Sequence, residues 1–148
     1  MSIKGFQTKI IYDTSIYIPF INNGTPYPAN ELNIGKPLTY LCAVVVEELY
    51  AGAFDNTSIK LLDKMYETFE SLGRLITPAA PDWQKTGKVV AALAKKYGFE
   101  DMFLSRMVND VLISLSARQI GAVVVTRNIK DFLRIKEFVN FNIAANQK

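Results

Sequence analysis

The chain has 148 residues, which suits one domain around a single core, and 49% of them are hydrophobic, which excludes an intrinsically disordered protein. No apolar run reaches the roughly 18 residues of a membrane-spanning helix, and the first residues lack the apolar core of a signal peptide. Cys42 is the only cysteine, which excludes an internal disulfide. We therefore expect a cytoplasmic protein. The absence of histidine excludes Ser-His and Cys-His catalysis and the usual zinc ligands, and the net charge of +3 permits a phosphate-bearing partner without requiring one.

The first half of the chain predicts strands that alternate with helices. Apolar runs indicate the strands, apolar residues at helical spacing indicate the helices, and Gly and Pro residues indicate the loop. In chain order, the predicted elements are a strand at Thr8–Tyr12, a short helix at Thr14–Ile21, a loop at Asn22–Pro37, a strand at Leu38–Cys42, and helices at Ala43–Phe54 and Thr57–Leu72.

The second half continues this alternation. Its predicted elements are a strand at Arg74–Thr77, helices at Asp82–Tyr97, Asp101–Met107 and Asp110–Ile120, a strand at Ala122–Thr126, a helix at Ile129–Phe138, a strand at Val139–Ile143 and a frayed tail at Ala144–Lys148. Such a pattern predicts an α/β fold with a parallel sheet covered on both faces. In sheets of this kind, ligands bind beyond the carboxyl ends of the strands.

Four acidic residues lie at informative places in this pattern. Asp13 ends the first strand, Glu48 lies on the helix after the second, Asp110 begins the apolar helix, and Asp131 follows the strand buried on both faces. If these carboxylates converge, they repel one another and their pKa values rise. A bound divalent cation would remove the repulsion, and oxygen ligands select Mg²⁺ or Mn²⁺. Such a site suits phosphodiester hydrolysis by metal-activated water.

Each acid also has an ordinary structural interpretation. Asp13 is also consistent with a helix N-cap, and Asp110 with a first-turn acid that the helix dipole favours. Glu48 and Asp131 are also consistent with solvent-exposed helix charges. The order of all four along an alternating pattern is a stronger signal than any one of them.

Four segments of the chain form a recognisable motif set. They are D-T-S from Asp13, E-L-x-x-G from Glu48 to Gly52, N-D-x-L-I-x-x-x-A from Asn109 to Ala117, and T-R-N-x-x-D-F from Thr126 to Phe132. In this order they resemble the PIN domain, and most closely the VapC-type toxins of bacterial and archaeal toxin–antitoxin pairs. The resemblance extends from about Thr8 to Ile143.

The resemblance implies a single PIN-like domain over residues 1–148, with a three-layer α/β/α fold and a central, mostly parallel sheet of four or five strands. It implies an endoribonuclease that uses Mg²⁺ or Mn²⁺ and hydrolyses RNA through metal-activated water held by clustered carboxylates. It also implies a cognate antitoxin and a homodimer. The candidate surfaces for these two partners are the helices predicted at Ala43–Phe54 and Thr57–Leu72.

Residue by residue, the resemblance assigns the metal to Asp13 and Asp110, and Glu48 and Asp131 complete the catalytic acids. The candidate substrate and pocket residues are Thr14, Ser15, Thr126, Arg127 and Asn128. Either Asn128 or Asp131 supplies the fourth acidic position of the family.

Two features depart from the family pattern: Ser114 and Leu115 stand where relatives often have alanines, and the loop Asn22–Pro37 is long. Arg127 and Lys130 lie beside the site and are candidate phosphate contacts. The lysines of the helix at Asp82–Tyr97 favour a solvated face over an RNA contact. They are Lys85, Lys88, Lys95 and Lys96.

Three alternatives compete with a toxin ribonuclease. A PIN nuclease that processes RNA without an antitoxin uses the same residues. A degenerate PIN module would bind RNA or protein without cutting, and retention of all four acids argues against it. A receiver domain also combines an α/β fold with acids and Mg²⁺, but the strand predicted at Arg74–Thr77 ends without the acid that phosphorylation requires.

Overall fold

The computed structural model describes residues 7–28, 36–98 and 100–145. Residues 29–35 of the predicted loop and 146–148 of the predicted tail lie outside this range. The strands are β1 (Lys9–Tyr12), β2 (Leu38–Cys42), β3 (Leu75–Ile76), β4 (Val123–Thr126) and β5 (Asn142–Ala145). The helices are α1 (Thr14–Asn23), α2 (Ala43–Ala51), α3 (Asn56–Ser71), α4 (Ala80–Tyr97), α5 (Asp101–Ile120) and α6 (Ile129–Lys136).

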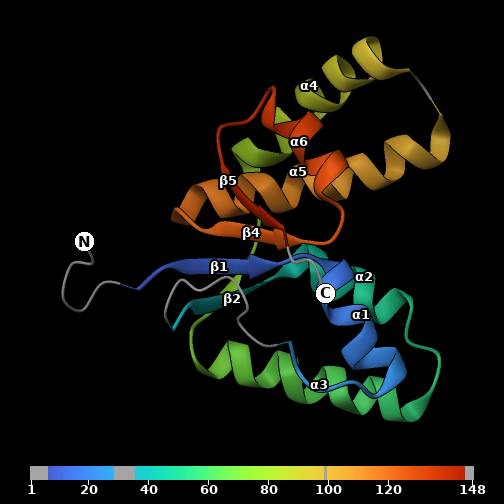
Figure 1. Ribbon diagram of the computed structural model, residues 1–148, viewed down its shortest axis with the longest axis vertical. Coiled ribbons are helices and arrows are strands. Elements are labelled where there is room, and N and C mark those ends of the chain that lie inside the picture. Colours follow the sequence, from blue (N-terminus) through green and yellow to red (C-terminus); the bar gives the residue numbers. More distant parts are fainter. Residues whose placement is uncertain (1–6, 29–35, 99, 146–148) are drawn as a thin grey trace.

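These strands form one parallel sheet in the order β3-β2-β1-β4-β5, which confirms the predicted α/β class. The chain first winds outward from β1 to β3, then crosses to β4 and winds outward the other way. Since parallel crossovers are right-handed, the two directions place helices on opposite faces and produce three layers. Figure 1 shows α1, α2 and α3 grouped near β1 and β2, and α4, α5 and α6 grouped near β4 and β5.

The centre of the sheet is buried on both faces. Ile10 and Ile11 of β1 pair with β4 residues Val123 and Val124, and all but Val123 are fully enclosed. Central parallel strands have helices above and below them, which explains why their sequences are continuous apolar runs. Among the described residues, no helix is long and apolar enough to cross a membrane.

The largest correction concerns α5. Separate helices were predicted at 101–107 and 110–120, but the structure has one 20-residue helix from Asp101 to Ile120. Asp110 therefore lies in the helix interior, and its interpretation as a first-turn acid is wrong. Asn109 and Asp110 misled the prediction because both residue types favour N-caps over helix interiors. Fully buried Met107 and Val111 pack the helix on either side of this pair, and tertiary packing overrides local propensity.

Other differences are shifts of element ends. The last strand was predicted at 139–143 but begins at Asn142, because buried Val139 and Phe141 belong to the connection after α6. α1 extends two residues further than predicted, to Asn23, where Gly24 caps it in the left-handed conformation that favours glycine. α2 and α6 end earlier than predicted, at Ala51 and Lys136.

Candidate active site

The winding direction of the sheet reverses between β1 and β4. Asp13 follows the last residue of β1, and Thr126 is the last residue of β4. The backbone N–H of Asp13 donates to the carbonyl of Val125 at 3.1 Å, which carries the pairing of the two strands to their ends. Ligands of open α/β sheets bind at such a reversal, beyond the carboxyl ends of the strands. The topology therefore places Asp13 at the expected binding position.

Both carboxylate oxygens of Asp13 accept hydrogen bonds from hydroxyls. Ser15 Oγ donates to Oδ1 at 2.6 Å, and Thr126 Oγ1 donates to Oδ2 at 2.8 Å. Asp13 occupies the N-cap position of α1, as its structural interpretation predicts, but its side chain makes no capping hydrogen bond, so capping does not account for this carboxylate. The side chain is only 5% exposed. Burial raises the pKa of Asp13, the two hydroxyls lower it, and the charge of Glu48 raises it.

Backbone groups after β4 orient these two hydroxyls. The N–H of Arg127 donates to Ser15 Oγ at 3.1 Å, and the N–H of Asn128 donates to Thr126 Oγ1 at 2.8 Å. Each hydroxyl thus accepts from a backbone N–H and directs its own proton to Asp13. These hydrogen bonds link the connection between β4 and α6 to the residues that follow β1.

Glu48 reaches the same site from α2. Thr14 Oγ1 donates to Glu48 Oε1 at 2.6 Å, which links α2 to the first residue of α1. Glu48 is half-buried, whereas its neighbour Glu47 is exposed. α2 begins directly after β2, so that its sixth residue is turned toward the carboxyl end of β1.

Asp110 approaches from the opposite layer, on α5. It is 7% exposed, and its Oδ2 is the only buried side-chain nitrogen or oxygen atom in the described part of the chain without a hydrogen-bond partner. Burial raises its pKa to about 8, helped by the charges of Asp13, Glu48 and Asp131 and opposed by Arg106. The other three acids therefore lie within electrostatic range of Asp110. An unpartnered buried carboxyl oxygen is energetically costly and calls for an explanation.

Asp131 lies in the first turn of α6 and has two partners. Asn128 Nδ2 donates to Asp131 Oδ2 at 2.9 Å, and Arg106 Nε lies 3.3 Å from the same oxygen. Asn128 and Asp131, the two candidates for the fourth acidic position, therefore form a single hydrogen-bonded unit. Arg106 was missed in the sequence. It precedes Asp110 by one helical turn, a signal that appears only if α5 is recognised as continuous.

The structure does not bring every candidate side chain into this network. Thr14, Ser15 and Thr126 contribute their hydroxyls. Arg127 contributes only its backbone N–H. Both Arg127 and Lys130 are exposed at the surface. Their role as phosphate contacts stays a prediction.

The chemistry of these donors fits a hard cation. As the side chains stand, no three carboxylates among residues 7–28, 36–98 and 100–145 are grouped closely enough to enclose a metal ion. Mg²⁺, however, commonly uses one or two carboxylates and keeps several waters. Asp13 and Asp110 supply two such carboxylates, and the unpartnered Asp110 Oδ2 is the atom that a cation would satisfy.

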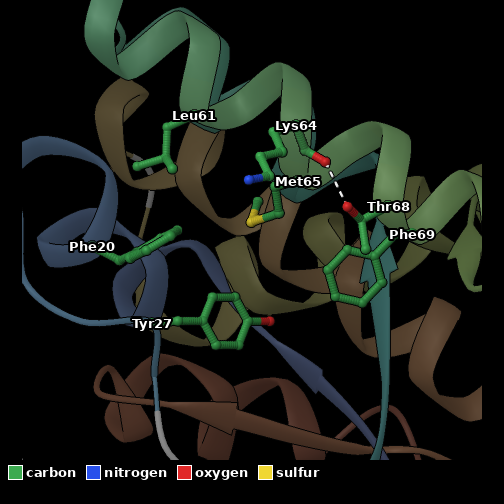
Figure 2. Close-up of a pocket in the computed structure, with 7 residues that line it drawn as sticks. All are labelled: Phe20, Tyr27, Leu61, Lys64, Met65, Thr68 and Phe69. Atoms are coloured by element: carbon green, nitrogen blue, oxygen red, sulfur yellow. Dashed lines mark hydrogen bonds between the residues drawn. The ribbon is translucent and has the colours of Figure 1, made fainter.

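A separate apolar groove lies between α1 and α3 (Figure 2). It encloses about 330 Å³ and is lined by Phe20, Tyr27, Leu61, Lys64, Met65, Thr68 and Phe69. The side chain of Phe20 packs edge-to-face on Tyr27, with ring centroids 5.2 Å apart, and the two rings form the wall opposite α3. None of the four acids lines this groove.

No protein-family model matches the sequence, and no curated protein matches it. Among solved structures, the chain is similar to VapBC2 from Rickettsia felis bound to a promoter DNA fragment, with 22% identity, 95% of this chain and 100% of that chain covered, and a TM-score of 0.64. DNA-bound VapBC from Salmonella typhimurium gives 22% identity, coverage of 94% and 98%, and a TM-score of 0.64. VapBC-5 from Mycobacterium tuberculosis gives 19% identity, coverage of 94% and 99%, and a TM-score of 0.59. The resemblance inferred from the motifs is thus confirmed at the level of the fold: the chain has the PIN-like fold of these VapBC structures.

Proposed function

We propose that the chain is a metal-dependent endoribonuclease and the toxin of a VapBC-like toxin–antitoxin pair. One observation carries the nuclease part: the buried Oδ2 of Asp110 has no hydrogen-bond partner among the described residues, and the charges of three other acids act on this carboxyl. A purely structural acid would have been supplied with a donor. The fold of the VapBC structures supports the same proposal.

In this proposal, Asp13 and Asp110 would hold Mg²⁺ or Mn²⁺, which when bound would supply positive charge beside the scissile phosphate and lower the pKa of a water molecule. Ser15 and Thr126 hold the Asp13 carboxylate in place. Thr14 donates to Oε1 of Glu48, and because no described residue donates to Oε2, that oxygen is the proposed acceptor for the proton of the attacking water. The water oxygen would bond to phosphorus as the bond from phosphorus to the leaving oxygen breaks, and the leaving oxygen would take up a proton from solvent.

The test uses the purified chain, freed of any bound partner, with total RNA in Mg²⁺, Mn²⁺ or EDTA. We expect discrete cleavage that EDTA, Asp13→Asn, Asp110→Asn and Glu48→Gln all abolish. Glu47→Gln is the matched control, since it removes an exposed charge from the adjacent position of α2. Cleavage that survives Asp110→Asn would refute the proposed site. A folded, inhibitor-free chain that cuts no RNA would instead be a binding module.

The apolar groove between α1 and α3 is the proposed contact for the antitoxin (Figure 2). Its aromatic and aliphatic lining suits an apolar side chain, and Lys64 at its edge suits an acidic neighbour of that side chain. The similar structures are VapBC complexes, which supports a partner of this kind. Co-expression with the product of an adjacent small reading frame should inhibit cleavage, and Leu61→Asp should weaken that inhibition. Without any such inhibitor, an RNA-processing nuclease becomes the better proposal.

We further propose a homodimer that uses the α2–α3 region. Phe54, in the connection between these helices, is 91% exposed, and aromatic residues are enriched in protein interfaces. Sedimentation analysis should show a dimer that Phe54→Ser weakens. A monomer at all concentrations would contradict this assignment.

A further inference from the structure

We propose that a basic groove formed by α4, the end of α5 and the segment after α6 binds the backbone of single-stranded RNA, as a second contact site outside the carboxylate cluster. The inference rests on the proposed ribonuclease function and deepens it. The groove encloses about 480 Å³ and is lined by Pro81, Gln84, Lys85, Lys88, Val89, Ala92, Arg118 and Phe138. α4 and α6 both pack beside α5, which brings these segments together (Figure 1).

The groove gathers positive charge that nothing nearby neutralises. Lys85, Lys88 and Arg118 line it, no acid does, and none of the three forms an ion pair or side-chain hydrogen bond with the residues that the structure describes. Asp82, the nearest acid on α4, is buried and accepts a hydrogen bond from the backbone of Ala79 at 2.9 Å. Lys96 on the same helix differs, because it is paired with Glu137.

An aromatic ring in the groove favours nucleic acid over an acidic peptide. Phe138 lines the groove and is 36% exposed. Cationic side chains that follow the phosphates, combined with an aromatic face on which a base stacks, are the usual elements of sites for single-stranded nucleic acid. The Arg118 guanidinium can in addition bind a phosphate through two parallel hydrogen bonds.

The groove lies at the other edge of the sheet from the acids, because Arg118 shortly precedes β4 and Phe138 shortly precedes β5, and it is therefore a separate contact site for the RNA. Arg118 follows Asp110 by eight residues on α5, a separation of about 12 Å along the helix. The sequence analysis predicted that the lysines of α4 form a solvated face, but the structure divides them into two groups. Lys85 and Lys88 face the groove, whereas Lys95 lies outside its lining and Lys96 is neutralised.

The test measures binding of a fluorescently labelled 20-nucleotide oligouridine to the full chain in EDTA, over a series of NaCl concentrations. Metal is absent, so the measurement does not depend on cleavage. The double variant Lys85→Gln with Lys88→Gln should lower the affinity at least about tenfold at low salt, and should reduce the slope of log K against log salt by about 1.4, or 0.7 for each lost phosphate contact. The control, Lys60→Gln with Lys95→Gln, removes the same charge from outside the groove and should change both quantities much less.

Two further variants identify the ligand. Arg118→Gln should weaken binding of the oligouridine and of inorganic polyphosphate alike. Phe138→Leu should weaken binding of the oligouridine several-fold but leave polyphosphate binding unchanged, because polyphosphate has no bases to stack. The proposal is overturned if the groove and control variants bind RNA equally, or if only an acidic peptide such as oligoglutamate responds to the groove variants. Cleavage is scored separately, so a groove that binds RNA in a chain that does not cut would refute the nuclease proposal alone.

Discussion

The two buried aspartates of the site are nearly equal in exposure, yet they are solvated very differently. Asp13, at the end of β1, has a hydroxyl donor on each carboxylate oxygen. Asp110, in the interior of α5, has an oxygen without any partner and a pKa raised to about 8. The strand ends thus hold a carboxylate that is already positioned, and the helix adds one whose charge is poorly solvated. This difference shows which half of the site carries an energetic cost in the free protein.

The two Asp→Asn variants should have the largest effects: both should lose activity, but they should differ in stability. Both should reduce metal-dependent cleavage by at least about 100-fold, since each removes a proposed metal ligand. Asp110→Asn should also raise the free energy of unfolding at pH 8 by about 1–4 kcal/mol, because it removes a poorly solvated charge. Asp13→Asn should stabilise less, since its amide loses a hydrogen bond from Ser15 or Thr126. Chemical denaturation of both variants measures the difference, and equal stabilisation would contradict the comparison.

Mg²⁺ should reverse the penalty at Asp110. At 100 times its Kd, one bound ion stabilises the folded state by about 2.7 kcal/mol. We expect Mg²⁺ to raise the melting temperature of the unaltered chain and of the Glu47→Gln control, but not that of Asp110→Asn. Thermal melts with and without EDTA provide the measurement. A shift of the same size in Asp110→Asn would place the ion elsewhere.

The pH dependence of stability follows from the same carboxyl. The folded-state pKa of Asp110, about 8, lies above the ordinary aspartate value of 3.8, so the folded state binds more protons between these values. The stability that this carboxyl contributes is therefore complete below about pH 4 and declines as pH rises toward 8. Asp110→Asn should make stability fall less steeply with pH. A smaller fall should remain in this variant, because the pKa of Asp13 is also raised. An unchanged slope of unfolding free energy against pH would show that Asp110 is charged in the metal-free protein.

The hydroxyls that solvate Asp13 should have intermediate effects. Thr126→Val conserves the shape of the side chain but removes the donor to Asp13 and leaves the N–H of Asn128 unpaired, which should cost about 1–3 kcal/mol. Ser116→Ala is the control: this buried hydroxyl donates to the Leu112 carbonyl of the same helix, and its loss leaves no charged group without a partner. Urea unfolding compares the two, and equal losses would mean that Thr126 acts only through packing.

The sequence predicted the strand-end half of this site better than the helix half. Asp13 and Thr126 could be placed because a strand buried on both faces has a clear apolar pattern, and its end is the one place where polar residues begin. Asp110 was also identified from its place in the pattern, but its setting at a helix start was wrong, because Asn109-Asp110 has the local preference of a helix start whereas the structure puts it in the interior of α5. The solvation of the acids depends on contacts between residues more than 100 positions apart, such as Thr126 with Asp13. Such pairings are set by sheet order, which no local pattern encodes.

Arg106 should have the smallest effect, and it shows how the two halves are balanced. Its side chain is 57% exposed and lies 3.3 Å from Asp131, so loss of this ion pair in Arg106→Gln should cost only about 0.2–1 kcal/mol. Arg106 also lowers the pKa of Asp110, so that pKa should rise further in the variant and the decline of stability with pH should extend to higher pH. Arg134→Gln, which removes a cation of α6 that is not paired with Asp131, is the control. Unfolding measured from pH 5 to 9 separates the two effects. If Arg106 acts only through its ion pair with Asp131, Arg106→Gln will lower stability equally at every pH in this range. A loss of stability confined to the alkaline side would show that the charge of Arg106 also stabilises ionised Asp110.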